Sequence, residues 1–154
     1  MPPAAPVEVR IARPEDAATI ADFNVRLALE SEGLTLDPPT VRAGVEALFG
    51  DSSKGVYLVA EIDGRLVGQL MLTVEWSDWR NGPIYWLQSV YVAADARGSG
   101  VFRALWERAL ATARDAGARA VRLYVDEHNQ AAQEVYLRIG MQDSGYRVFE
   151  LEPV

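Results

Sequence analysis

The stretch Arg97-Gly98-Ser99-Gly100 places a cation and two glycines between two segments of regular pattern. Residues 84–92, which precede it, are rich in β-branched, aromatic and aliphatic side chains and predict a strand. Residues 101–116, which follow it, are amphipathic and predict a helix that ends at Gly117. A glycine-rich turn that opens a helix suits anion binding, because the first N–H groups of the helix lack partners and the helix dipole favours negative charge. The alternative is an ordinary strand-to-helix loop that needs two glycines.

Two nucleotide-binding motifs can be compared with this turn. A P-loop is excluded, because no Gly-Lys-Ser/Thr follows. A dinucleotide-binding oxidoreductase unit is a rival, since Gly98 and Gly100 lead into a helix and Asp126 follows the next predicted strand, where an acid would meet a ribose. Against it, Arg103 stands in the place of the third glycine, and three predicted strands and two predicted helices precede the strand that leads into the turn. The dinucleotide motif instead lies near the start of its fold.

Two further patterns point to acyl-CoA. Residues 97–102 match the pattern Arg/Gln-x-x-Gly-x-Gly/Ala except at Phe102, and residues 129–136 match Asn-x-x-Ala-x-x-x-Tyr in full, with Gly140-Met141 after them. In these motifs and in the order of its elements, the sequence resembles the GNAT superfamily of N-acetyltransferases over nearly the whole chain. Phe102 puts a bulky ring where the family usually has a tiny residue, so we expect a shifted helix start and retained binding.

The resemblance implies a site for acetyl-CoA. The pyrophosphate would lie on the backbone N–H groups from Gly98 to Phe102, with Arg97 adding positive charge. The pantetheine arm would lie along the central strand, and the Val90 N–H would stabilise charge on the thioester oxygen. Asn129 would bind the pantetheine, cap its own helix, or do both. The expected cofactor-binding residues are Val90, Tyr91, Val92, Arg97, Gly98, Ser99, Gly100, Val101, Phe102 and Asn129.

The resemblance also makes Tyr136 the general acid that protonates the leaving thiolate; a phenol with a pKa of about 10 is protonated at neutral pH. Several relatives have Glu or His where this chain has Gln88, and an amide cannot act as a base, so the role passes to another residue or to water. Glu75, Asp78 and Glu30 are the candidate bases, and Glu75 is the one we assign. Glu30, Asp78 and Gln88 are expected to bind the amine. Trp76, Trp79 and Trp86 could line a pocket, or belong to the core or an interface.

Composition limits the function classes. The chain has 154 residues, no cysteine, one histidine (His128) and a formal net charge of −7. These numbers argue against disulfides, a thiolate nucleophile, a histidine-based metal site and nucleic-acid binding, and they allow a cationic substrate. No apolar run of membrane length and no signal-peptide pattern occur, so we expect a cytoplasmic protein without a membrane partner. A homodimer is compatible with the sequence, and the last predicted strand is a candidate for exchange.

The elements that must position these residues alternate in type. We expect a flexible tail at residues 1–6 and one acetyltransferase domain at residues 7–154. The fold class is α/β of the mixed α+β type: one mixed, mostly antiparallel central sheet with helices on both faces. Alternation along the central strand predicts that Trp86, Gln88, Val90 and Val92 share one face. The expected strands are 7–11, 56–62, 65–74, 84–92, 119–125 and 146–151, and helices are expected to open near Pro14, Pro38, Val101 and Asn129.

The prediction is an N-acetyltransferase that moves an acetyl group directly from acetyl-CoA to a primary amine in a ternary complex, without a metal. The absence of cysteine agrees with direct transfer. The alternatives are an NAD(P)-binding oxidoreductase and an acyl-CoA-binding module without catalysis, the latter suggested by Gln88.

Overall fold

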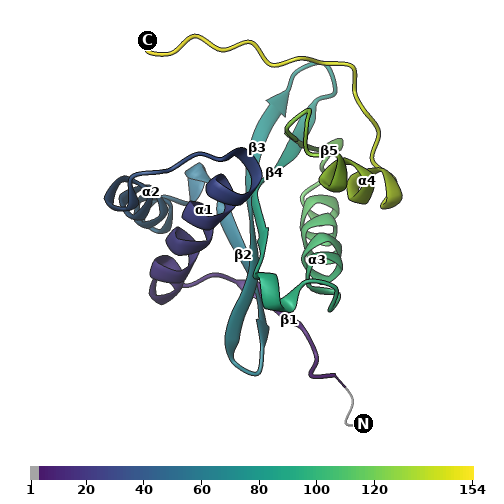
Figure 1. Ribbon diagram of the computed structural model, residues 1–154. Coiled ribbons are helices and arrows are strands. Elements are labelled where there is room, and N and C mark those ends of the chain that lie inside the picture. The colour runs from purple at the N-terminus through teal and green to yellow at the C-terminus, as the bar shows by residue number, and fades with distance from the viewer. Residues whose placement is uncertain (1–3) are drawn as a thin grey trace. The chain divides into compact units, whose positions relative to one another are not determined.

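The computed structural model describes residues 4–154 (Figure 1). The chain forms two compact units, the first running to Tyr124 and the second from Val125 to Val154. Of the tail predicted at residues 1–6, residues 1–3 lie outside the described part, and residues 4–6 form neither helix nor strand. That residues 7–154 form a single domain stays a prediction.

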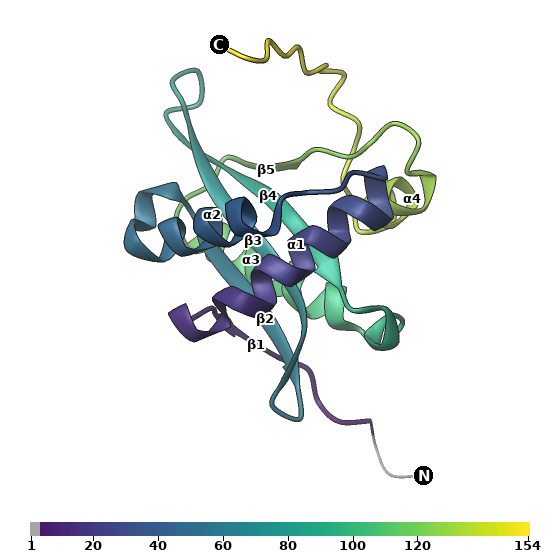
Figure 2. The same cartoon turned by 60° about the vertical axis from the view of Figure 1, so that its left-hand side comes forward.

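The first unit is built on a five-stranded sheet whose spatial order follows chain order (Figure 2). The first four strands pair as antiparallel neighbours, whereas β5 pairs with β4 in parallel. The sheet is therefore mixed and mostly antiparallel, which confirms the predicted class. The strands are β1 Glu8–Ile11, β2 Val56–Ile62, β3 Arg65–Ser77, β4 Gly82–Val92 and β5 Ala120–Leu123.

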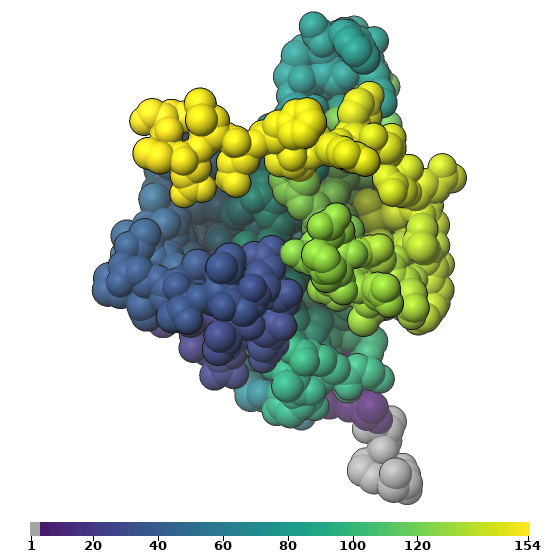
Figure 3. All heavy atoms as spheres, turned by 45° about the horizontal axis from the view of Figure 1, so that its top comes forward, coloured from purple at the N-terminus to yellow at the C-terminus, as the bar shows by residue number. Residues whose placement is uncertain are grey.

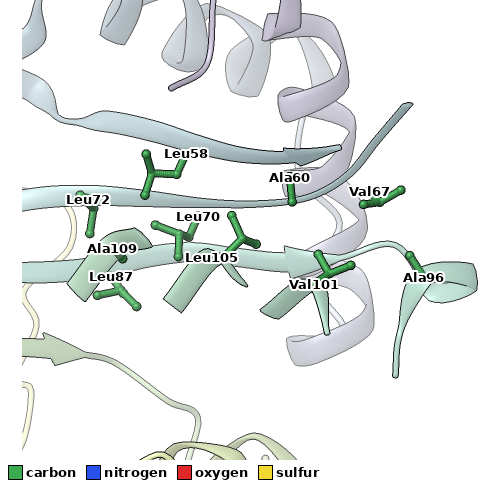
Figure 4. Packing of buried hydrophobic residues seen from close by; sticks show 10 residues of the cluster. All are labelled: Leu58, Ala60, Val67, Leu70, Leu72, Leu87, Ala96, Val101, Leu105 and Ala109. Carbon is green, nitrogen blue, oxygen red and sulfur yellow. The ribbon is translucent and has the colours of Figure 1, made fainter. Parts of the chain in front are cut away.

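Helices cover both faces of this sheet, as predicted (Figure 1). α1 (Ala17–Glu32) and α2 (Pro38–Gly50) pack on one face through a core that includes Ile20, Val45 and Val59. α3 (Val101–Asp115) packs on the other face. Figure 4 shows that second core, made by Leu58, Ala60, Val67, Leu70, Leu72, Leu87, Ala96, Val101, Leu105 and Ala109. Short 3-10 turns occur at η1 Pro14–Asp16, η2 Ser52–Lys54 and η3 Ala94–Ala96. In the described part of the chain, none of the helices has both the length and the hydropathy needed to span a bilayer.

β4 contains a bulge in its pairing with β3. The register pairs Gln69 with Tyr91 and Met71 with Gln88, so two residues of β4 stand opposite one residue of β3 between these pairs. Ser89, in the bulge, has a φ of +52°, a left-handed conformation that residues with a side chain rarely adopt. The bulge therefore holds a strained backbone in the middle of a central strand.

The bulge reverses the alternation of side chains along β4. Leu87 before it and Val90 and Val92 after it all pack in the core beneath α3. Gln88 lies on the opposite face. Its register partner in β3, Met71, packs in the core beneath α1 and α2. The prediction that Trp86, Gln88, Val90 and Val92 share one face is wrong, because the extra residue exchanges the two faces at Ser89.

Of the two hairpin connections predicted from the sequence, one is confirmed and the other is shorter than predicted. The Asp63-Gly64 turn joins β2 and β3 with φ values of +51° and +76°, as the Asp-Gly signal predicts. The connection predicted at residues 75–83 is shorter than expected, since β3 runs to Ser77 and β4 begins at Gly82. Glu75 therefore lies in a strand and not in a loop, because its aromatic and branched neighbours extend the antiparallel pairing.

The second unit contains α4 (Gln130–Arg138), which begins where the Asn129 motif predicts. The strand predicted at residues 146–151 is absent from the described residues, and this prediction is wrong. Tyr146, Phe149 and Leu151 are exposed in this extended segment. An alternating apolar pattern makes a strand only when a neighbouring strand supplies hydrogen bonds, and none does so here within residues 4–154.

Candidate active site

The glycine-rich turn connects η3 to α3 in an open conformation. Gly98 and Gly100 have φ values of +80° and +81°, which explains the need for glycine at both positions. A Cβ atom added at either glycine would meet no atom within 4 Å, so the space above the turn is open. Gly100 is the N-cap of α3, and no side chain caps the helix in its place. The turn thus combines space with the positive end of a helix, a combination that fits a phosphate group.

The start of α3 is held close to the sheet by a glycine in β3. A Cβ atom at Gly68 would lie 2.7 Å from Val101 Cγ1 and 3.3 Å from Leu105 Cδ1. Only a residue without a side chain lets the first turns of α3 approach this closely. α3 begins at Val101, where the apolar pattern places it, and the shift relative to the family that Phe102 suggests stays a prediction.

Arg97, at the entrance of the turn, joins α1 to the end of β4. Its Nε donates to the Val92 carbonyl at 3.0 Å, and its Nη2 pairs with Glu30 Oε2 at 2.7 Å. The guanidinium lies over the Tyr91 ring, 5.6 Å from its centroid, and the Tyr91 hydroxyl donates to Glu30 Oε1 at 3.2 Å. Burial and the charge of Glu30 raise the pKa of Tyr91. Glu30, predicted as an acid for the amine, therefore lies beside the glycine-rich turn.

β4 and β5 part beside the predicted pantetheine residues. Within residues 4–154, β5 pairs with β4 only from Ile84 to Leu87, whereas β4 continues to Val92. The stretch that contains Val90 and Tyr91 therefore has an edge without β5 as neighbour, and the bulge leaves an extra residue out of the ladder on its other side. Backbone groups at such a position are available to a ligand.

A second cluster lies on the face of the sheet that Gln88 shares. Arg122 Nη1 lies 3.6 Å from Glu75 Oε2, and its guanidinium lies 5.9 Å from the Trp86 ring. The Trp86 and Tyr124 rings have centroids 4.6 Å apart, and Gln88 Nε2 donates to Thr73 Oγ1 at 2.8 Å. The structure thus links Glu75 and Trp86 through Arg122 and adds Tyr124, whereas Gln88 lies on the same face with Thr73 as its bonded partner. No local sequence signal identifies Arg122 and Tyr124, because Arg122 reaches the cluster through the parallel register of β5 against β4.

Asp78 and two of the tryptophans lie outside this cluster. The hairpin that joins β3 to β4 protrudes from the surface (Figure 3, teal). Asp78 accepts a hydrogen bond from the Trp79 backbone N–H at 2.9 Å in its turn. Trp76 and Trp79 are 64% and 90% exposed, so of the three tryptophans only Trp86 takes part in the cluster.

In the second unit, the Asn129 motif adopts the predicted local structure. Asn129 Oδ1 accepts from the Ala132 N–H at 3.1 Å, so it caps α4. Tyr136 lies near the other end of the same helix, and burial raises the pKa of its phenol. Within residues 4–154, no group of three or more His, Asp and Glu side chains is placed to hold a metal ion.

Comparison with known proteins agrees with both motifs. The model of the acetyltransferase (GNAT) family matches residues 25–141. An uncharacterized N-acetyltransferase from Mycobacterium tuberculosis (strain ATCC 25618 / H37Rv) is 35% identical over 138 residues, which cover 90% of this chain and 75% of the relative. Thialysine N-epsilon-acetyltransferase from Bos taurus is 29% identical over 162 residues, which cover 95% of this chain and 92% of the relative. The crystal structure of a possible acetyltransferase from Clostridium difficile 630 has 40% identity and a TM-score of 0.89, covering 96% of this chain and 98% of that chain.

These similarities favour acyl-CoA over a dinucleotide as the ligand of the turn, and they favour catalysis over a binding module. The family model spans both the glycine-rich turn and the Asn129 motif, and members of this family use acetyl-CoA. The chain therefore belongs to the GNAT family of acetyltransferases and is an N-acetyltransferase.

Proposed function

We propose that the enzyme transfers an acetyl group directly from acetyl-CoA to a primary amine in a ternary complex. The observation that carries the proposal is the continuity of two features: β4 parts from β5 after Leu87, and the same strand leads into the open glycine-rich turn before α3. In such an arrangement the backbone groups at the edge of β4 can bind the extended pantetheine arm of acetyl-CoA. The N–H groups at the start of α3 can bind its phosphates. Acetyl-CoA would supply an activated acyl group at this strand.

We assign three roles in the proposed reaction. The Val90 N–H would donate to the thioester oxygen, where negative charge develops during attack. Glu75, or water that it orders, would take the proton of the amine as the C–N bond forms. Tyr136 would give a proton to the sulfur as the C–S bond breaks, and its raised pKa keeps the phenol protonated at neutral pH.

A small cationic amine is the acceptor that we propose. The chain is acidic overall, and Glu75 and Asp78 belong to the β3–β4 hairpin beside Trp86, an aromatic ring of the kind that binds cations. The similarity to thialysine N-epsilon-acetyltransferase, whose name states an amine acceptor, supports this class. Arg122 offsets part of the acidic character, which favours an acceptor that also has an anionic or polar group.

We further propose that the enzyme acts in the cytoplasm and forms a homodimer. The absence of cysteine supports the compartment. The exposed apolar residues Tyr146, Val148, Phe149 and Leu151 support a dimer contact. Sedimentation at several concentrations tests the dimer, and a monomer at every concentration would contradict it.

Initial-rate kinetics test the central proposal. CoA thiol release is measured with acetyl-CoA and a panel of polyamines, basic amino acids, neutral amino acids and aminoglycosides. Direct transfer in a ternary complex predicts double-reciprocal lines that intersect, and no acetyl-enzyme by mass spectrometry before the amine is added. Parallel lines with an acetylated protein would overturn direct transfer.

A further inference from the structure

A glutamine is fully buried in the strand next to the bulge. Gln69 lies in β3 between Gly68 and Leu70 and has 0% exposure. Its Nε2 donates to Asn24 Oδ1 of α1 at 2.8 Å and to the backbone carbonyl of Ser89 at 3.2 Å. The only side-chain amide of the sheet that is completely buried, among residues 4–154, is therefore bonded to the strained residue of β4.

The chemistry of the partners fixes the orientation of this amide. A backbone carbonyl can only accept, so Ser89 must receive the NH₂ end of Gln69. Asn24 then presents its oxygen to Gln69 and its Nδ2 to the Tyr57 hydroxyl, 3.3 Å away in β2. A chain of hydrogen bonds thus runs from Tyr57 in β2 through Asn24 in α1 and Gln69 in β3 to the bulge in β4, and it links four elements through their polar groups.

The amide of Gln69 has both a cost and a benefit for stability. Gln69 Oε1 is buried and has no hydrogen-bond partner within residues 4–154, which costs free energy. An apolar side chain of similar size would avoid that cost, but it would leave the Ser89 carbonyl and Asn24 Oδ1 without the N–H groups that Gln69 donates. Ser89 is meanwhile held at a φ of +52°, and a strained residue persists only where its surroundings fix it. The amide of Gln69 supplies one such contact at Ser89, besides its bond to Asn24, and an apolar residue could supply neither.

We propose that Gln69 is a positioning residue for acyl transfer. Its bond to the Ser89 carbonyl holds the bulge in the shape that directs the next N–H group, that of Val90, to the thioester oxygen. The inference rests on the proposed role of Val90, and it adds a residue of β3 that does not touch the substrate. Loss of the bond would free the Ser89 peptide to change its orientation within the bulge and would weaken the polarisation of the thioester carbonyl.

The test uses acetyl-CoA labelled with ¹³C at the thioester carbonyl, whose stretching frequency falls when the oxygen accepts a hydrogen bond. We expect a downshift on binding to the wild-type enzyme, and a smaller or absent downshift with Gln69→Leu. The kcat of Gln69→Leu should fall at least tenfold, while the Kd for CoA, which depends on the glycine-rich turn, stays within twofold of wild type. Val59→Ala is the control: Val59 is also fully buried and pairs with Gln69 in the sheet, so its Tm should fall while the carbonyl frequency stays that of wild type.

Gln69→Glu provides a second readout that does not depend on the leucine variant folding. A protonated carboxyl can donate one hydrogen bond to Ser89, whereas the carboxylate cannot. The ratio of its kcat to that of wild type should therefore rise as the pH falls.

The outcomes separate the two proposals. A wild-type enzyme without the carbonyl downshift would overturn the role of Val90 itself. A downshift in wild type that is equal in Gln69→Leu, or a kcat ratio for Gln69→Glu that is low and the same at every pH, would overturn the role of Gln69 and leave that of Val90 intact.

Discussion

Arg97 and Glu30 form an ion pair of 2.7 Å although they are 67 residues apart in the chain. If Arg97 contributes charge to a phosphate site, then Glu30 competes with the phosphate for it. The pair is about half exposed, so its effect is small, and Glu30→Gln should tighten CoA binding by about twofold to fivefold at low salt. Calorimetry at two salt concentrations measures this, with Glu32→Gln as the matched charge control. An equal gain in both variants would show a general charge effect and not release of Arg97.

The glycine-rich turn can be tested with a charge placed in its open space. Gly100→Asp puts a carboxylate where we place the pyrophosphate, and CoA binding should fall by about 100-fold or more because like charges repel in the site. Gly117→Asp is the matched control, since Gly117 also has a positive φ and open space around it, at the other end of α3. Both variants should lose similar Tm. Unchanged CoA affinity in Gly100→Asp would remove the phosphate from this turn.

A single methyl group added at Gly68 should destabilise the fold. In Gly68→Ala the new Cβ would lie 2.7 Å from Val101 Cγ1, so α3 must move away from the sheet, at a cost of about 1–3 kcal/mol. Gly44→Ala, in α2 with nothing within 4 Å, should instead raise stability by up to about 1 kcal/mol. Urea denaturation measures both. If Gly68→Ala is as stable as wild type, the close approach of α3 is not the reason for glycine.

The role of Glu75 can be tested by pH. At low pH most of the amine carries a proton, so a base that removes it matters most there. Glu75→Gln should therefore lower kcat/KM more at low pH than at high pH. Asp78→Asn, in the turn of the same hairpin, provides the comparison. A wild-type profile in Glu75→Gln would exclude Glu75, and a steeper profile in Asp78→Asn would transfer the role to that residue.

Tyr136→Phe separates a general acid from a packing residue. The change keeps the ring, and kcat should fall by about 100-fold or more while acetyl-CoA binding stays nearly constant. Because burial raises the pKa of Tyr136, the wild-type activity should fall only as the pH rises through that raised pKa, and the phenylalanine variant should lack this limb. The same shift favours the neutral phenol in the folded state, so its contribution to stability is present at neutral pH and is lost as the pH rises through the raised pKa. A near-normal kcat for Tyr136→Phe would show that Tyr136 is not the general acid and that water protonates the thiolate.

The elements of this protein were accessible from the sequence wherever a local signal specified them. Asp63-Gly64 fixed the β2–β3 hairpin, and the Arg97–Gly100 turn with the pattern after it fixed the start of α3. Asn129 marked the start of α4 through its cap. Each of these turn and cap signals depends only on residues that are close in the chain, so the sequence alone is enough to predict them.

What could not be predicted depends on contacts between distant segments. The residue in the bulge, Ser89, is hydrogen-bonded to Gln69, twenty residues earlier, and serine is not a residue type that predicts a left-handed backbone. The pairing of Glu75 with Arg122 required the register of β5 on β4. The segment 146–151 has the composition of a strand, but strand formation also requires a partner, which composition cannot supply.

The bulge also determines how β4 would respond to changes in chain length. A deletion of one residue at Ser89 would restore regular alternation and turn Val90 and Val92 out of the core beneath α3, while it would bring Tyr91 into that core. Arg97 would lose the aromatic ring over which it lies. Substitutions at this point change one side chain, whereas a single inserted or deleted codon would exchange both faces of the strand that leads to the turn.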